Sequence, residues 1–216
     1  MKNIICTLGI RRSGNSPIRN WVSDQFPNSR TFLNAHPDIL SQLDEVQEDD
    51  IIVSFEEMPV ELFDTIEHKK VLILRDPANL FASRVKHYDA LSSKKQYISP
   101  MVTDLWLNHA KRFLKPGDII AVNHQTFLTD EKYRKGIAKK LGASKFCDCT
   151  LDRVDDNGQG SSFDGLDYDG NATEMPVFER WKEYADLQCF RDLFTDEIKE
   201  LAVTIYGEQS WIKLFS

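Results

Sequence analysis

Two adjacent arginines lie in a glycine-bounded stretch, residues 8–17, near the start of the chain. The apolar run 4–8 precedes this stretch, and apolar residues at helical spacing follow it from Ile18 to Phe26, which predicts a strand, a loop and a helix. The free N–H groups at the start of a helix bind anions, and arginines add permanent positive charge. We therefore expect a phosphate site whose ligands are Arg11, Arg12, Ser13, Gly14, Asn15 and Ser16. The alternative is a basic turn on the surface.

The spacing from Gly9 to Gly14 matches the P-loop pattern G-x-x-x-x-G-K-[ST], in which the lysine contacts the terminal phosphates. Asn15 stands at the lysine position, and Ser16 follows it. Pro17 suits the first helical turn, with Ser16 as its N-cap. The missing lysine argues against transfer of a terminal phosphate but leaves phosphate binding intact.

A second group of polar residues, Arg75-Asp76-Pro77 with Ser83, follows the strongly apolar run 71–74. That run predicts a strand that ends at Arg75, and Pro77 opens a helix on which Ser83 lies about two turns later. An arginine binds phosphate through two parallel hydrogen bonds, and a serine hydroxyl adds a donor. These residues suit a second phosphate; the alternative is that Arg75 pairs with Asp76 or with a helix C-terminus.

The remaining pattern alternates strands with helices and predicts an α/β fold with a central parallel sheet of about five strands flanked by helices. We expect a single domain, 1–216, in which the Asp- and Gly-rich segment 147–176 is a loop or lid and 176–207 holds two C-terminal helices, at about 176–187 and 190–206. The expected strands are 4–8, 31–33, 51–55, 71–74 and 119–122, and further helices are expected at 37–43, 60–66, 101–114 and 130–141.

Ligands of such sheets lie beyond the carboxyl ends of the strands. Four groups of residues should meet there, namely Arg11 with Arg12, Glu56 with Glu57, Arg75, and Asn123 with His124. If the backbone stays extended through the two glutamates, their side chains point to opposite sides, and only one of them faces the ligand.

Composition excludes several classes of function. The formal net charge of −7 disfavours non-specific nucleic-acid binding, so any anion site must be local. No stretch is apolar enough to span a membrane. The four cysteines form no C-x-x-C pair or zinc motif, so we expect free thiols, no metal site and a cytoplasmic protein. The sequence does not indicate an oligomeric state.

Together these motifs resemble the sulfotransferases that use 3′-phosphoadenosine 5′-phosphosulfate (PAPS). In that family an N-terminal strand-loop-helix holds the 5′-phosphosulfate, and a strand ending in Arg-Asp-Pro, with a serine eight residues after the arginine, holds the 3′-phosphate. Residues 74–84 match the second motif closely, and the resemblance covers residues 1–145. It implies a P-loop NTPase-like architecture, PAPS as the donor and no metal.

The resemblance also assigns individual residues. Arg12 occupies the position of a catalytic lysine; it cannot readily give up a proton, but it can stabilise charge on the oxygen that bridges sulfur and phosphorus. Glu57 falls at the position of the catalytic base, and His124 replaces a tyrosine near the adenine. The family's adenine-stacking tryptophan falls on Pro17, and its C-terminal Arg-Lys-Gly motif has no match, although 159–162 could supply donors instead.

We therefore expect an enzyme that transfers the sulfuryl group of PAPS to an acceptor hydroxyl. A carbohydrate is the first expectation for the acceptor, because a glutamate base resembles the carbohydrate-acting branch of the family; another small molecule is the broader one. Two alternatives stay open. One is a P-loop kinase of small molecules, which would require Mg²⁺, and the other is a non-catalytic nucleotide-binding or partner-binding protein.

Overall fold

Five parallel strands form the centre of the protein. The computed structural model describes residues 3–46, 50–91, 100–155 and 160–215. The strands are β1 (Asn3–Gly9), β2 (Ser29–Phe32), β3 (Asp50–Glu56), β4 (Lys69–Leu74) and β5 (Ile120–Asn123). They are arranged in the order β2-β3-β1-β4-β5. This arrangement confirms the predicted α/β class and its central parallel sheet.

The register brings the carboxyl ends of the strands to one edge. Gly9 of β1 pairs with Glu56 of β3 and with Ile73 of β4, and Leu74 pairs with Asn123 of β5. The segments that follow these four strands therefore leave the sheet together, as the sequence predicts.

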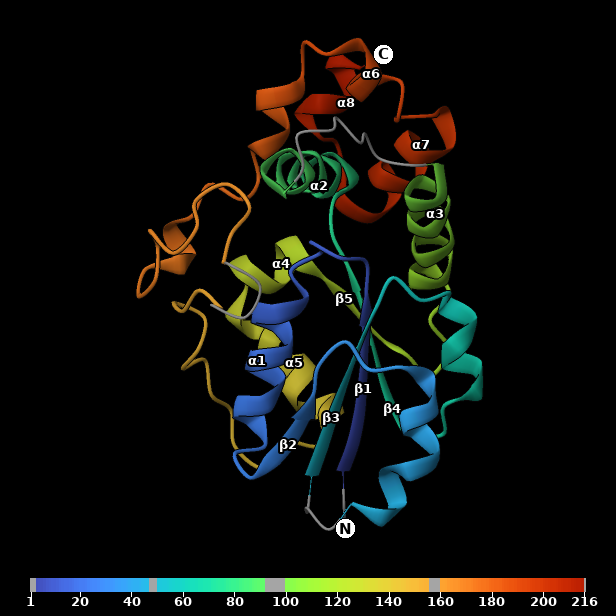
Figure 1. The fold of residues 1–216 in the computed structure, drawn as a ribbon, viewed down its shortest axis with the longest axis vertical. Coiled ribbons are helices and arrows are strands. Elements are labelled where there is room, and N and C mark those ends of the chain that lie inside the picture. The colour runs from blue at the N-terminus through green and yellow to red at the C-terminus, as the bar shows by residue number, and fades with distance from the viewer. Residues whose placement is uncertain (1–2, 47–49, 92–99, 156–159, 216) are drawn as a thin grey trace.

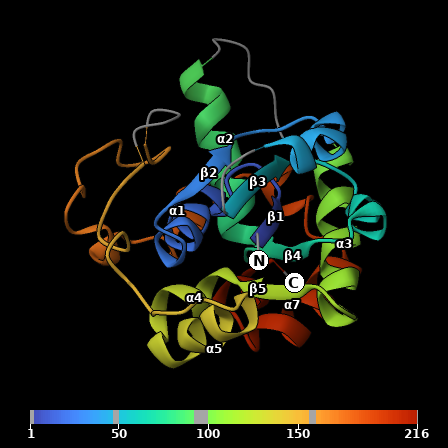
Figure 2. The same cartoon turned by 90° about the horizontal axis from the view of Figure 1, so that it is seen from below.

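Apolar clusters cover both faces of the sheet. On one face Trp21, Phe127 and Ile137 pack against Ile5 and Ile52, and on the other Leu43 and Phe63 pack against the strands. Helices α1 (Asn15–Gln25) and α3 (Pro100–Leu114) lie on opposite sides of the strands in both views (Figures 1 and 2). The other elements of these two clusters are α4 (His124–Thr129), α5 (Glu131–Leu141), η1 (Pro37–Glu45) and η2 (Val60–Thr65).

A third apolar cluster lies beyond the carboxyl edge, where α2 contacts the C-terminal helices (Figure 1). Two indole N–H groups fix the end of β4 to this cluster: Trp106 donates to the Arg75 carbonyl at 2.9 Å, and Trp211 donates to the buried Asp76 carboxylate at 2.9 Å. The helices of the cluster are α2 (Pro77–Leu91), α3, η4 (Arg180–Tyr184), α6 (Gln188–Arg191), α7 (Asp196–Tyr206) and α8 (Ser210–Leu214).

Several predicted elements need correction. The helix expected at 176–187 is only the 3₁₀ turn η4, and the helix expected at 190–206 is split into α6 and α7. The split has a local cause, because the Thr195 side chain accepts from the Ile198 N–H and so starts a new helix. Gly207 ends α7 at a φ of 73°, as expected of a residue after a helix.

Ser16 is not the N-cap of α1. The helix already includes Asn15, and Gly14 caps it in the left-handed conformation without a side-chain hydrogen bond. The described part of 147–176 contains one short helix, η3 (Ala172–Glu174), and one isolated bridge between Ser161 and Gly165. Residues 156–159 of the expected loop or lid lie outside the described residues.

The prediction of four free thiols is wrong for two of them. Cys147 and Cys149 form a disulfide, because an irregular turn brings their Cα atoms to 5.5 Å, a normal distance for a disulfide. Cys6 is free and buried, and Cys189 is free and exposed. No helix among the described residues is both long and apolar enough to cross a membrane.

Candidate functional site

A cavity of about 500 Å³ opens at the carboxyl edge of the sheet. The last residue of β3 and the segments after β1, β4 and β5 contribute to its wall, together with residues of 151–155 and 160–180. Its charged lining is predominantly basic, since six arginines face two carboxylates, Glu56 and Asp155, in the part of the chain that the structure describes. The arginines are Arg11, Arg12, Arg19, Arg75, Arg153 and Arg180.

The loop after β1 is closely packed. A Cβ on Gly9 would lie 1.9 Å from Asn15 Oδ1, and a Cβ on Gly14 would lie 2.2 Å from the His124 ring. Gly14 also has a φ of 82°, a conformation that glycine adopts without steric cost. Both positions therefore require glycine because a side chain would collide with Asn15 or His124.

Small polar side chains line the inside of this loop. The Ser13 hydroxyl is buried without a hydrogen-bond partner among the described residues, and so is Asn15 Oδ1. Asn15 Nδ2 donates to the Ile10 carbonyl at 3.1 Å and to Glu56 at 3.0 Å. Ser16 lines the cavity directly. Of the predicted loop ligands, Arg11, Arg12, Gly14, Asn15 and Ser16 line the cavity, whereas Ser13 is not among the lining residues.

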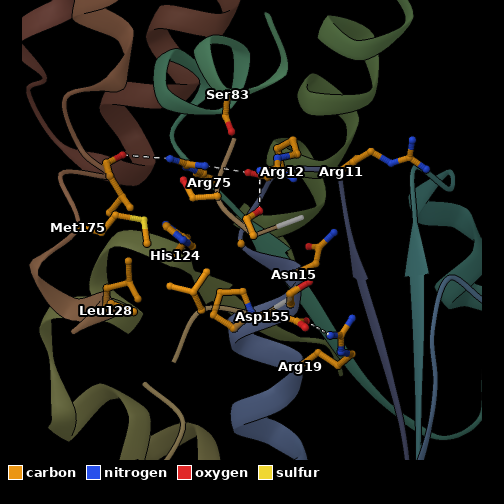
Figure 3. A pocket seen from close by; sticks show the side chains of 18 of the residues that line it. Arg11, Arg12, Asn15, Arg19, Arg75, Ser83, His124, Leu128, Asp155 and Met175 are labelled. Carbon is orange, nitrogen blue, oxygen red and sulfur yellow. Dashed lines mark hydrogen bonds and ion pairs between the residues drawn. The ribbon is translucent and has the colours of Figure 1, made fainter. Parts of the chain in front are cut away.

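Arg75 is buried between two backbone carbonyls. It donates to the Arg12 oxygen at 2.9 Å and to the Val177 oxygen at 3.0 Å (Figure 3). Burial lowers the pKa of Arg75 to about 9, with a further contribution from the charge of Arg180, so that Arg75 stays protonated near neutral pH. A buried cation held mainly by neutral acceptors favours an incoming anion, and the guanidinium has further N–H donors to offer.

Arg12 and Ser83 contact the segment 160–162. Arg12 Nη2 donates to the Gly160 carbonyl at 3.3 Å, and the Ser83 and Ser162 hydroxyls lie 2.7 Å apart. Burial, followed by the charge of Arg180, lowers the pKa of Arg12. The residues expected to bind anions therefore also hold this segment over the cavity.

Arg180 is a cavity residue that the sequence analysis did not identify. It donates to Ser161 Oγ at 2.8 Å and to Asp164 at 2.6 Å, and its guanidinium lies 4.9 Å from the centre of the Phe163 ring. It is the first residue of η4, within the range predicted as a helix, and no motif in the sequence separated it from other arginines.

Arg19 and Asp155 were also not identified. They form an ion pair of 2.5 Å in the cavity wall, with side chains 5% and 7% exposed. A signal for Arg19 existed, because it lies four residues after Asn15 and so on the same face of α1. Arg153 also lines the cavity, at an exposed position.

The two glutamates at the end of β3 have different surroundings. Glu56 lines the cavity, where it accepts from Asn15 and lies 3.5 Å from Arg11. Glu57 is absent from the described lining of the cavity and forms an ion pair with Arg84. Its φ of 58° shows that the extended backbone stops at Glu56, so the alternation of the strand does not decide between the two.

One end of the cavity is apolar. Leu128 and Met175 lie there beside His124, at the end of the view opposite to Arg11 (Figure 3). His124 is buried, and burial, followed by the charges of Arg75 and Arg180, lowers its pKa well below the ordinary value. Its ring is therefore neutral. Further apolar lining comes from Leu151, Val154, Ala172 and Val177.

Among the described residues, no group of three or more His, Cys, Asp or Glu side chains is placed to hold a metal ion. The prediction that no metal is needed stays a prediction.

Neither the protein-family models nor the curated proteins match this sequence. Among solved structures, it is similar to mouse sulfotransferase SULT7A1 complexed with PAP, with a TM-score of 0.54 and 12% sequence identity. The similarity covers 100% of this chain and 88% of the mouse chain. The chain therefore shares the overall fold of this mouse enzyme. At this identity the similarity defines the architecture around the cavity but not the ligand, so the roles of individual residues depend on the geometry above.

Proposed function

We propose that this protein is a sulfotransferase that transfers the sulfuryl group of PAPS to a hydroxyl of a small acceptor. One observation carries the proposal: the loop after β1 and the end of β4 meet at a single cavity lined by six arginines. The fold shared with a PAP-complexed sulfotransferase supports it.

The cavity fits a nucleotide that carries two separate anionic groups. The N-terminus of α1, Ser13–Ser16 and Arg12 would hold the 5′-phosphosulfate, because backbone N–H groups and a guanidinium converge there. Arg75 and Ser83 would hold the 3′-phosphate, with Arg180 as an additional cation. The apolar end around Leu128 and Met175 suits an adenine, and His124 lies beside it.

Bound PAPS supplies a sulfuryl group and a phosphate leaving group. A carboxylate at the end of β3 would accept the proton of the acceptor hydroxyl while that oxygen forms its bond to sulfur and the bridging S–O bond breaks. Arg12 and the N–H groups of the loop would stabilise the charge that develops on the leaving phosphate.

The cavity geometry favours Glu56 for the proton transfer, since Glu56 lines the cavity and Asn15 orients it. Glu57, the position that the family resemblance indicates, would instead fix Arg84. A polar acceptor such as a sugar suits the Arg11 end, and the lining of the cavity offers further polar side chains in Asn34 and His87.

PAPS turnover, screened against sugars and small alcohols in excess EDTA, tests this function. We expect formation of 3′,5′-ADP and a sulfated product without added metal, because arginines and backbone N–H groups neutralise the donor. Arg30→Ala, which changes an arginine of β2 outside the cavity lining, should keep this activity. An activity that disappears in EDTA and returns with Mg²⁺ would contradict the mechanism.

A further inference from the structure

The disulfide between Cys147 and Cys149 lies where the chain leaves α5 and approaches the cavity. Cys149 is exposed and Cys147 is half-buried, so at least one sulfur is accessible to a small reagent. A single residue separates the two cysteines. The stabilisation that a disulfide gives by restraining the unfolded chain grows with the length of the closed loop. For a loop this short that entropic stabilisation is small, so it does not explain the bond.

Two residues of α1 hold the disulfide segment. Gln25 donates to the Cys147 carbonyl at 2.6 Å and accepts from the Cys147 N–H at 3.1 Å. Trp21 donates to Asp148, the residue between the cysteines, at 2.7 Å, and Arg134 of α5 forms an ion pair with the same carboxylate at 2.9 Å. The segment is therefore fixed to the helix whose N-terminus forms the candidate anion site.

The same segment continues directly into the cavity wall. Leu151, Val154 and Asp155 line the cavity, and Asp155 forms the buried ion pair with Arg19, again on α1. The residues between Cys147 and Asp155 thus connect an accessible disulfide with the lining of the cavity. Both ends of this stretch contact α1, the first through Trp21 and Gln25 and the second through Arg19.

We propose that Cys147 and Cys149 form a thiol–disulfide exchange site for small thiols and disulfides of the glutathione type, and that its redox state sets the affinity of the adjacent cavity for its nucleotide. The inference rests on the proposed function only for the choice of nucleotide.

The exchange is balanced as follows. A small thiolate attacks the exposed Cys149 sulfur, the S–S bond breaks, and Cys147 leaves as a thiolate. The Cys149 N–H donates to Cys147 Sγ at 3.2 Å and is placed to stabilise that leaving group. A second small thiol then releases Cys149 as a thiol. The protein gains two electrons and two protons, and the two small thiols become one small disulfide.

Reduction removes the bond that fixes the backbone of 147–149, which loosens the connection to Leu151 and Asp155. We expect the affinity for 3′,5′-ADP to fall about fivefold or more, in the usual range of coupling between sites. Coupling is reciprocal, so saturating 3′,5′-ADP should favour the disulfide by the same factor. Fivefold corresponds to a shift of about 20 mV for this two-electron couple, at about 30 mV for each tenfold.

The test is a glutathione redox titration of the whole protein, from about −180 to about −300 mV, with alkylation of free thiols and mass spectrometry at each cysteine. We expect Cys147 and Cys149 to titrate together within this range and the midpoint to move to a more negative potential with 3′,5′-ADP. Calorimetry on the oxidised and reduced forms measures the affinities. A Cys147→Ser/Cys149→Ser variant should bind like the reduced form, and Cys189→Ser, at the exposed free cysteine, should behave like the unchanged protein.

Each outcome decides the proposal. A pair that stays oxidised, or stays reduced, across the whole range is not an exchange site. A pair that titrates with equal affinities in both forms would overturn the coupling. If 3′,5′-ADP binds neither form, the proposed function and the coupling to that nucleotide fail, whereas the alkylation result still decides whether the exchange site exists.

Discussion

Glu56 and Glu57 are adjacent and identical, yet their surroundings differ because the backbone turns between them. The positive φ of Glu57 ends the strand and directs one carboxylate to the cavity and the other to Arg84. At the scale of single residues, such turns decide which of two equivalent side chains can meet a substrate.

Glu56→Gln should lower kcat about 10²–10⁴-fold, the usual contribution of a general base, because the amide keeps the shape but cannot accept the proton. The affinity for 3′,5′-ADP should change by less than about 0.5 kcal/mol. Glu57→Gln is the matched control and should retain turnover. Kinetics with an acceptor found in the screen measure both variants. If Glu57→Gln abolishes turnover and Glu56→Gln does not, the base is the residue that the family resemblance indicates.

Arg75→Ala should remove the preference for 3′,5′-ADP over 5′-AMP, because the 3′-phosphate loses charge-assisted hydrogen bonds worth about 1.5–3 kcal/mol. Calorimetric titration with both nucleotides measures the preference. Since Arg75 also holds the Arg12 and Val177 carbonyls, circular dichroism should first establish that the variant is folded. Equal losses for the two nucleotides would give Arg75 a structural role only.

The sequence predicted many of the residues that line the cavity, because short motifs at strand ends specify them locally. Arg11, Arg12, Arg75, Ser83 and His124 all line the cavity as expected. Other lining residues, Val154 and Asp155 among them, come from irregular segments whose position depends on tertiary contacts, and no local pattern encodes such contacts.

At the scale of elements, the unit of β1, its loop and α1 depends on tight contacts of two glycines. The strands and long helices were predictable because each has a clear apolar period. The C-terminal region was not predictable, because its short helices bury aromatic residues such as Phe190 and Trp211 without a sustained apolar period.

Gly14→Ala should weaken 3′,5′-ADP binding at least about tenfold, as the new methyl group would force His124 or the loop to move. Gly117→Ala is the matched control: its φ is 60°, also left-handed, and a Cβ there meets nothing within 4 Å. Both variants should lose about 1–2 kcal/mol of unfolding free energy from the backbone alone. Denaturant unfolding and calorimetry separate the two effects. Unchanged nucleotide affinity in Gly14→Ala would show that the loop does not bind the ligand.

At the scale of the whole molecule, a net charge of −7 is combined with a cavity whose charged lining is mostly arginine. The net negative charge of the chain repels polyanions, whereas the arginines of the cavity attract a small anion. The buried histidines add a dependence of stability on pH, because burial lowers the pKa of both His109 and His124.

Acid should therefore destabilise the protein. Below about pH 6.5 the unfolded chain binds protons at these histidines and the folded chain does not, so the free energy of unfolding falls as pH falls, by up to about 1.4 kcal/mol per pH unit for each histidine. His124→Gln should remove one of these contributions. Urea unfolding between pH 7 and 5 without nucleotide measures the slope, and an unchanged slope in the variant would mean that His124 is protonated in the fold.

Thermal unfolding with a panel of nucleotides tests the central claim most directly. At about 100 times its dissociation constant a ligand stabilises by about 2.7 kcal/mol, which for a chain of this size raises Tm by about 5–10 °C. We predict this shift for 3′,5′-ADP, a smaller one for 5′-AMP at the same concentration, and none for ATP with Mg²⁺. A shift with ATP and Mg²⁺ but not with 3′,5′-ADP would contradict the sulfotransferase assignment and favour a kinase.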